Sequence, residues 1–233
     1  MKLLVFSVVA SLMFLMPQKV AIQFTSNLAN IKCGESVTLK WRVDGAERIY
    51  ISNIGTVKTQ GEIQVKPSRS VNFILVAEGS YDVQSKSLMI TVDPCSKGPD
   101  DYPDDDVFKE QLNVTRSVAS VVNFLDQTQR ILQDQMEFSV RSFSSNDGAF
   151  IFITKVSQRE ITDPDDIKNR INVRRISYRV EIRKSDQPKK LTYNIKTFIQ
   201  YKKKLEETWR QENKDSIHRT EAEKLRAYLD RLP

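Results

Sequence analysis

Apolar and polar residues alternate along the first part of the chain. In the segment VTLKWRV, residues 37–43, every second residue is apolar, and Thr38, Lys40 and Arg42 stand between them. The same period of two recurs in four more short runs, which place on one face Ile49 and Ile51, Ile63 and Val65, Phe73, Leu75 and Ala77, and Leu88, Ile90 and Val92. Such a pattern is typical of half-buried β-strands. Because short strands with one wet face must cover their apolar faces, the pattern predicts an all-β sandwich over residues 22–95.

From residue 107 on, the spacing of the apolar residues changes between a helical period of 3.6 residues and a strand period of two. Apolar residues at helical spacing predict a helix of roughly 20 residues after the linker, and these are Val114, Val118, Val121, Val122, Leu125 and Leu132. Two hairpins follow, turning at residues 144–148 and 185–190, and a short helix is expected to begin between them at Pro164. Residues 208–215 fit a strand or the start of a terminal helix equally well. This order predicts an α+β domain over residues 107–233, in which a curved antiparallel sheet wraps a helix.

The chain opens with the layout of a signal peptide. Lys2 precedes an apolar run from Leu3 to Met16, which Pro17 interrupts before Ala21. The run is shorter than the roughly 20 apolar residues of a membrane span. Residues 1–21 therefore predict a cleaved leader and an exported protein, periplasmic or extracellular. An uncleaved leader that anchors the protein to the inner membrane is the alternative.

An acidic segment separates the two patterns. Residues 96–106 contain Pro, Gly and five aspartates, namely Asp100, Asp101, Asp104, Asp105 and Asp106. The spacing lacks the central glycine and the distal glutamate of a Ca²⁺-binding loop. We therefore interpret the segment as a solvated acidic linker whose last aspartate helps to cap the next helix, and we predict no metal site.

A set of glycine, apolar and turn residues recurs through the first part of the chain, namely Ile31, Gly34, Ser36, Val37, Thr38, Leu39, Trp41, Gly45, Ala46, Ile54, Gly55, Val57, Gly61, Val65, Pro67, Phe73, Leu75 and Ala77. With these residues, the first part of the chain resembles the bacterial immunoglobulin-like domains of exported and cell-surface proteins. Leu28 departs from the pattern, because the family often has a proline there. The resemblance implies a β-sandwich that acts as a scaffold or an adhesion unit. Residues 107–233 are only weakly similar, in element order alone, to nuclear-transport-factor-2-like domains.

The same resemblance bears on the two cysteines. In an immunoglobulin-type sandwich the first strand commonly pairs in parallel with the last, which would bring Cys33 close to Cys95. An oxidising compartment permits a stable disulfide, so a bridge between Cys33 and Cys95 is predicted. Two unrelated free thiols are the alternative.

Positive charge is concentrated in one segment. The chain holds 36 basic and 30 acidic residues, a net charge of +6, whereas residues 168–204 hold thirteen basic residues against Glu181 and Asp186. Arg175, Arg179 and Arg183 share one side of a predicted strand, and hairpin pairing brings Lys190 or Lys196 to the same surface. These five residues predict a basic face for an anionic partner, which is a lipid surface, a polyanionic envelope polymer or an acidic protein of the envelope. An ordinary solvated face is the alternative.

Other chemistry is sparse. The only histidine, His218, lies in a charged segment and is expected to be exposed and inert. No nucleophile motif, phosphate-binding loop or metal-ligand spacing occurs in the sequence. The predicted basic face also lacks the interleaved aromatic residues on which the bases of a nucleic acid stack. We therefore expect a non-catalytic binding or scaffold protein without a cofactor and without a nucleic-acid partner. The alternative is a hydrolase or small-ligand protein with a pocket in the concave face of the second sheet, lined by Phe138, Phe150, Phe152, Tyr178 and Tyr193.

Overall fold

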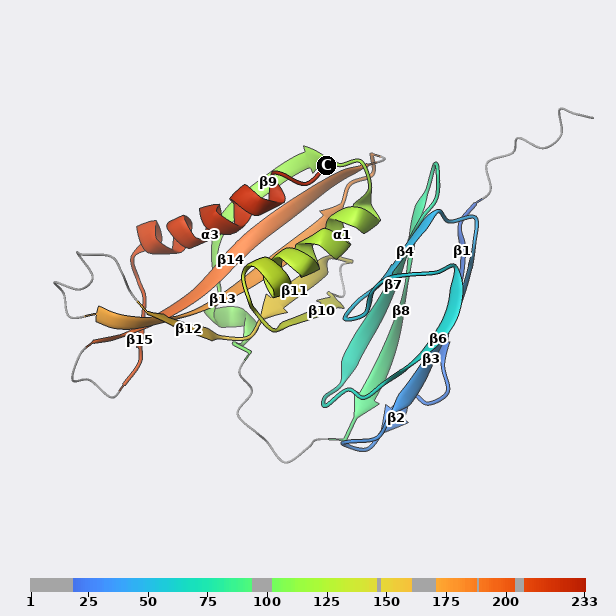
Figure 1. The fold of residues 1–233 in the computed structure, drawn as a ribbon, viewed down its shortest axis with the longest axis horizontal. Helices are drawn as coiled ribbons and strands as arrows, with labels where there is room; N and C mark the ends of the chain where they lie inside the picture. Colours follow the sequence, from blue (N-terminus) through green and yellow to red (C-terminus); the bar gives the residue numbers. More distant parts are fainter. Residues whose placement is uncertain (1–18, 94–101, 146–147, 161–170, 188, 204–207) are drawn as a thin grey trace, which may run out of the picture.

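The computed structural model describes residues 19–93, 102–145, 148–160, 171–187, 189–203 and 208–233. The fold is rich in β-structure, with 52% of the described residues in strands and 17% in helices. In this part of the chain the strands form three sheets (Figure 1). Two of them belong to residues 19–93, hereafter the N-terminal half, and one belongs to residues 102–233, hereafter the C-terminal half.

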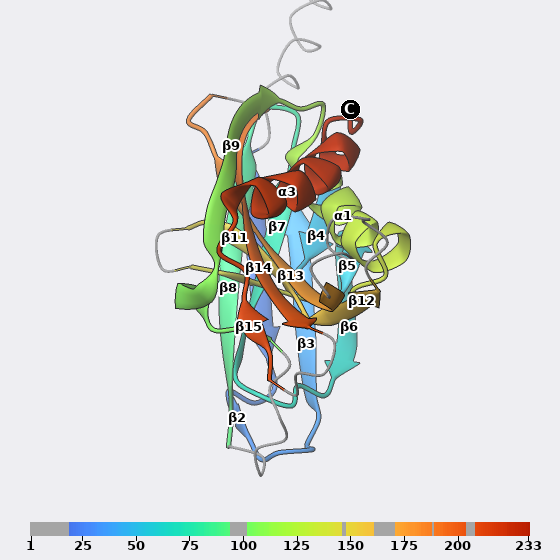
Figure 2. The same ribbon diagram turned by 90° about the vertical axis from the view of Figure 1, so that its left-hand side faces the viewer.

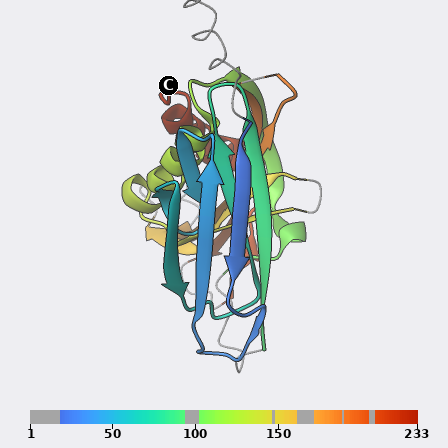
Figure 3. The same ribbon diagram turned by 90° about the vertical axis from the view of Figure 1, so that its right-hand side faces the viewer.

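The N-terminal half consists of two sheets with a common apolar core. A three-stranded antiparallel sheet has the order β1 (Ala21–Ser26), β3 (Val37–Asp44) and β6 (Gln60–Val65), and Figure 3 shows β1 and β3 side by side. A five-stranded sheet has the order β2 (Asn30–Ile31), β8 (Val83–Val92), β7 (Val71–Glu78), β4 (Arg48–Ile51) and β5 (Gly55–Val57). Side chains from both sheets form one buried cluster that includes Leu39, Trp41, Phe73 and Ile90. The predicted alternation of β3 is confirmed, since its residues are alternately buried and accessible.

The C-terminal half is built on a seven-stranded antiparallel sheet. Its main order is β10 (Val140–Ser144), β11 (Phe150–Thr154), β13 (Ile171–Lys184), β14 (Lys190–Lys203) and β15 (Arg210–Gln211), while β12 (Ser157–Glu160) pairs with β13 and β9 (Lys109–Ser117) pairs with β14. Helices α1 (Val121–Arg130) and α3 (Asp215–Leu229) lie on one face of the sheet (Figures 1 and 2). The last turn of α1 continues as a π-turn, η3 (Ile131–Gln135), and a 3₁₀ turn, η2 (Asp105–Val107), precedes β9.

One expectation for this half needs correction. The predicted helix was expected to include Val114, but residues 109–117 form β9, and Val114 lies opposite Tyr193 of β14. The helix begins only at Val121, where the Ser120 side chain accepts a 3.0 Å hydrogen bond from the Asn123 backbone. Val114 and Val118 are four residues apart, a spacing that fits one turn of a helix and also one face of a strand. Within residues 208–215, Arg210–Gln211 form the short strand β15 and Asp215 begins α3. The short helix expected at Pro164 lies outside the described residues.

The two halves share one hydrophobic core. Tyr50, Ile74 and Val76 lie on the face of the five-stranded sheet that points away from its partner sheet, and they belong to the same buried cluster as Phe124 and Phe150 of the C-terminal half. Figure 1 shows α1 and β10 lying against β4 and β7. The five-stranded sheet is therefore covered on both faces.

Polar contacts reinforce this interface at its edge. The buried carboxylate of Glu78, at the end of β7, accepts hydrogen bonds from the Ser120 hydroxyl and from the backbone amides of Val121, at 3.3 Å, and Val122, at 3.2 Å. A negative charge at a helix N-terminus is favourable because it meets unpaired amides and the positive end of the helix dipole. Helix α1 is therefore capped by a residue of the other half.

Candidate functional site

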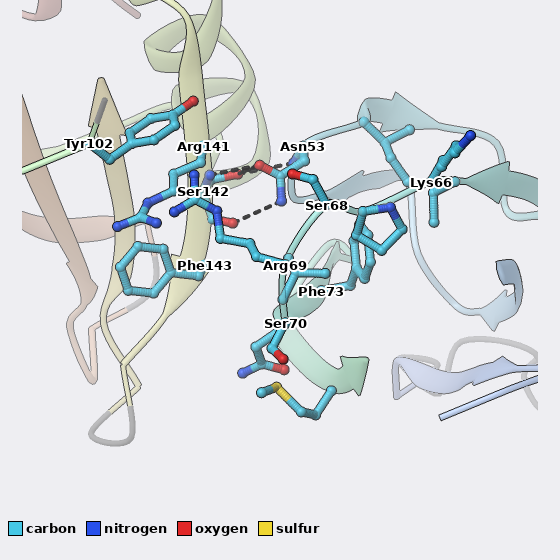
Figure 4. Close-up of a pocket in the computed structure, with 16 residues that line it drawn as sticks. Asn53, Lys66, Ser68, Arg69, Ser70, Phe73, Tyr102, Arg141, Ser142 and Phe143 are labelled. Carbon is cyan, nitrogen blue, oxygen red and sulfur yellow. Dashed lines mark hydrogen bonds between the residues drawn. The ribbon is translucent and has the colours of Figure 1, made fainter. Parts of the chain in front are cut away.

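The candidate site is a cavity of about 590 Å³ between the two halves, hereafter the junction cavity (Figure 4). The N-terminal half supplies the loop between β6 and β7, the turn after β4 and Met89 of β8, and the C-terminal half supplies Tyr102 and three residues of β10. Its sixteen described lining residues include three cationic side chains, Lys66, Arg69 and Arg141, and no aspartate or glutamate.

A paired polar contact fixes the position of the cavity wall. Asn53 has a positive φ of 62°, a conformation that asparagine tolerates better than most residues. Its Nδ2 donates to the Ser142 carbonyl at 2.9 Å, and its Oδ1 accepts from the Ser142 backbone amide at 2.7 Å. This two-way contact, drawn dashed in Figure 4, connects a turn of the N-terminal half to the middle of β10. It fixes Arg141 and Phe143, the neighbours of Ser142, at the cavity.

An aromatic ring at this site is surrounded by cations. The guanidinium carbons of Arg69 and Arg141 lie 4.8 and 4.7 Å from the centre of the Tyr102 ring, and Lys155 Nζ lies 5.7 Å from it. The electron-rich ring face attracts cations and so offsets part of their mutual repulsion. The cavity thus combines positive charge, hydrogen-bonding side chains such as Ser68 and Asn72, and aromatic surface, which suits an anionic ligand.

The five residues of the predicted basic face do not form one open surface. Arg175, Arg179 and Arg183 do share one side of β13, and Lys196 lies opposite Arg179. However, Arg179 is only 8% exposed, and its Nε is 2.7 Å from Glu181 Oε1, which also pairs with Lys196 at 2.9 Å. Burial acts to raise the pKa of Glu181, but the hydrogen bonds and charges of Lys196 and Arg179 outweigh it and hold this pKa below its usual value.

The remaining members lie far apart. Arg175 stacks on the Trp209 ring at 3.9 Å, near one end of the long β13–β14 hairpin, and Lys190 lies beside its turn at the other end, donating to Gln187 at 3.2 Å. Arg183 is eight residues from Arg175 along β13, a distance of about 27 Å at the rise of a β-strand. The middle of this face is covered because Tyr102, Phe108 and Phe143 pack on Ala149, Ile151 and Ile153 of the neighbouring segment.

The five aromatic residues expected to line a concave pocket are core residues. Phe138, Phe150, Phe152, Tyr178 and Tyr193 are all buried beneath the two helices, and Phe138 meets Tyr178 edge to face at 5.3 Å. Phe150 reaches a cavity of about 470 Å³ beside β7, whereas Tyr178 reaches a separate cavity of about 340 Å³ beside α3. The hydroxyls of Tyr178 and Tyr193 donate to Glu221 and Asp230, and burial, followed by these carboxylates, raises the pKa of both tyrosines.

The expectation that His218 is exposed is wrong. This residue is fully buried in α3, where its Nδ1 lies 2.7 Å from the Thr197 hydroxyl and its Nε2 lies 3.0 Å from the Glu212 carbonyl oxygen. Burial lowers the pKa of His218, and the charge of Lys109 acts in the same direction, against the hydrogen bond to Glu212. The spacing of His218 with Ala222, Leu225 and Leu229 in the sequence was the missed sign of a buried helix face.

The predicted disulfide stays a prediction, because Cys95 lies outside the described residues. The strands that precede the two cysteines do lie together, since β2 pairs in parallel with β8 and Ile31 is opposite Val92. Within the described ranges no group of three or more His, Cys, Asp or Glu side chains is arranged to hold a metal ion. No helix of these ranges has the length and apolar character that crossing a bilayer requires.

No family model matches the chain, and no curated protein matches it.

Proposed function

We propose that this chain is a non-catalytic, exported bacterial protein that binds an anionic polymer of the cell envelope in the junction cavity. In this proposal residues 22–95 form an immunoglobulin-like sandwich and residues 107–233 form an α+β domain. The leader-like segment 1–21 favours export. The parallel pairing of β2 with β8 is the arrangement that the immunoglobulin-like resemblance implies.

The observation that carries the proposal is the charge of the junction cavity. Three cationic side chains line it, and the described part of the lining contributes no carboxylate. Cationic groups gathered in a cleft concentrate the field there and attract anions more strongly than the same groups spread over a convex surface. A polymer is favoured over a lipid surface because the cations lie in a concave site, where a flat bilayer surface would not reach all of them.

The sandwich has a mechanical role in this proposal. It supplies one wall of the cavity, including Lys66 and Arg69, and it covers α1 through Tyr50, Ile74 and Val76. The ligand would therefore contact both halves at once, and the shared core would hold the two walls at a fixed separation.

Binding of a short acidic oligosaccharide tests the proposal. A uronic acid oligomer and a neutral oligomer of the same length are titrated into the full chain by calorimetry, in buffers of increasing salt. We expect the acidic oligomer to bind, with an affinity that falls as salt increases, and the neutral oligomer to bind much more weakly. Lys66→Gln and Arg141→Gln should each weaken binding on the order of tenfold, since each removes a charge-assisted contact.

Lys86→Gln is the matched control, because Lys86 is exposed on β8 and does not line the cavity. It should leave the affinity within about twofold of the wild type. Equal losses in Lys86→Gln and Lys66→Gln would show that only net charge matters, and would contradict a site in the junction cavity.

A further inference from the structure

A second cavity, hereafter the helix-side cavity, lies in the C-terminal half, where α3 and the end of η3 meet the seven-stranded sheet. It has a volume of about 340 Å³ and is lined by nine residues, which come from the end of η3 and the residue after it, from β12, from β13, and from α3 and the turn after it. It shares no lining residue with the junction cavity. Its size is at the lower end for ligand sites, so any occupant is small.

The floor of the helix-side cavity is apolar and its one carboxylate is compensated. Met136 and Tyr178 are 7% and 1% exposed. Tyr178 donates to Glu221 Oε2 at 2.9 Å, and Lys224 Nζ lies 2.6 Å from Glu221 Oε1. Both oxygens of Glu221 are thus engaged by the protein, which leaves little negative charge at the cavity to repel an anion.

Two arginines at this cavity have no carboxylate partner among the described residues. Arg159 donates to the Met136 carbonyl at 2.6 Å and lies 4.9 Å from the centre of the Phe138 ring. The guanidinium carbon of Arg231 lies 5.8 Å from the centre of the Tyr228 ring. Arginine presents several donors in a planar fork that matches a carboxylate, and a stacked guanidinium keeps part of this fork free for a ligand.

The backbone beside the cavity is irregular. The chain leaves α1 through the π-turn η3, closed by a 2.9 Å hydrogen bond from the Met136 amide to the Ile131 carbonyl. Glu137 follows with φ of 58°, in the left-handed region that residues other than glycine rarely adopt. Such π-turns and left-handed residues gather at functional sites, because local strain persists only where the surroundings maintain it. Here they bring Met136 and Gln135 to the cavity wall.

We propose that the helix-side cavity binds a small organic anion with an aromatic or aliphatic body. Arg159 and Arg231 hold the carboxylate of the ligand, while Met136, Tyr178 and Tyr228 contact its body. A cation is disfavoured because three of the four charged lining residues are positive. A neutral ligand of the same shape gains the apolar contact but not the charge-assisted hydrogen bonds.

Three probes of one shape test this assignment. Binding of 2-naphthoate, 2-naphthalenemethanol and 2-naphthylmethylammonium to the full chain is measured by calorimetry, with ligand-detected NMR for weak binding. We expect naphthoate to bind with one site per chain, the alcohol to bind at least about tenfold more weakly, and the ammonium not to bind. Similar affinities for all three, or no saturable binding of naphthoate, would overturn the proposal.

Variants locate the site. Arg231→Gln and Arg159→Gln should each weaken naphthoate binding by about tenfold or more. Arg219→Gln, the same change at an exposed arginine of α3 that does not line the cavity, should leave the affinity within about twofold. Arg159 also holds the Met136 carbonyl, so the fold of Arg159→Gln is checked by circular dichroism; if it fails to fold, Arg231→Gln alone decides. An unchanged affinity in Arg231→Gln would place naphthoate elsewhere and refute the assignment.

Discussion

Strands β3 and β7 of the N-terminal half have similar lengths but different surroundings. In β3 the outward residues Thr38, Lys40 and Arg42 remain accessible to solvent, and only the inward residues are buried. In β7 the inward residues Phe73 and Leu75 pack in the core between the sheets, but the outward residues Ile74 and Val76 are also buried, against the C-terminal half. One face of β3 is exposed to solvent, whereas both faces of β7 are packed against other parts of the protein.

This difference shows that the N-terminal half depends on the C-terminal half for part of its burial. Without α1 and β10, the five-stranded sheet would expose Tyr50, Ile74 and Val76 as a contiguous apolar surface. The interface also contains a buried hydrogen bond from the Tyr50 hydroxyl to Gln129 and the cap that Glu78 provides to α1. We therefore expect the two halves to be coupled in their stability.

The largest expected consequence of this coupling is that the halves unfold together. The chain has two tryptophans, Trp41 in the core of the N-terminal half and Trp209 against Arg175 in the C-terminal half. Urea unfolding of Trp41→Phe reports the C-terminal half by fluorescence, and that of Trp209→Phe reports the N-terminal half. After correction for the stability of each variant by circular dichroism, we expect coincident transitions with the same denaturant dependence.

Two separate transitions would contradict the coupling. In that case the shared core would contribute less than the internal core of each half, and β7 would behave like β3 despite its buried outer face.

The outer face of β7 provides a sharper test by mutation. Ile74→Ala removes a buried side chain from the interface and should lower the free energy of unfolding by about 3 kcal/mol. Lys40→Ala on the outer face of β3 removes only an exposed ion pair with Glu62 and should change it by less than about 0.5 kcal/mol. Urea unfolding measures both. Equal effects would mean that the interface is not a true core.

The cap at the N-terminus of α1 should have a somewhat smaller effect. Glu78→Ala leaves the amides of Val121 and Val122 buried without their acceptor and should cost about 2 kcal/mol. Glu78→Gln keeps one acceptor oxygen and should cost about half as much. Both free energies are measured by urea unfolding. If Glu78→Ala destabilised no more than Glu62→Ala, an exposed glutamate on β6, the capping role would be refuted.

The contrast between β3 and β7 also explains which features the sequence could predict. Strict alternation in VTLKWRV leads directly to the inward and outward faces of β3. The run FILVA in β7 and the run FIFI in β11 are continuous apolar stretches, the pattern of strands buried on both faces, and their second face was not used in the prediction. The second apolar face of these runs indicates that the five-stranded sheet has a neighbour, and that the basic side of the seven-stranded sheet is partly covered.

The candidate sites were less predictable than the strands. The junction cavity joins a turn at Asn53, the loop with Lys66 and Arg69, and β10 with Arg141, which lie far apart in the sequence and meet only through tertiary packing. A cluster of basic residues within one segment is easy to find in a sequence. The charges of one strand do not show, however, which residues from other segments cover that strand. Arg179 illustrates this, because its partner Glu181 is on the same strand, while the covering aromatic residues come from the linker, from the residue before β9 and from β10.

The smallest expected effect tests whether protonation of a residue in the C-terminal half changes the stability of the N-terminal half. His218 is the only histidine, it is buried in the C-terminal half, and its pKa is lowered. The unfolded chain therefore binds a proton more readily than the folded chain, so stability is complete above the unfolded pKa near 6.5 and is lost as the pH falls below it. The loss cannot exceed about 1.4 kcal/mol per pH unit for one group.

We expect unfolding of Trp209→Phe, observed through Trp41, to require less urea at pH 5.5 than at pH 7.5, although His218 lies in the other half. The pH dependence in this range should largely disappear in His218→Asn, because the carboxylates titrate mainly at lower pH. A Trp41 signal that is insensitive to pH, while circular dichroism of the C-terminal half shifts, would mean that the halves respond separately. A shift of both signals would extend the coupling from the interface to α3, which packs on the far side of the shared core from β7.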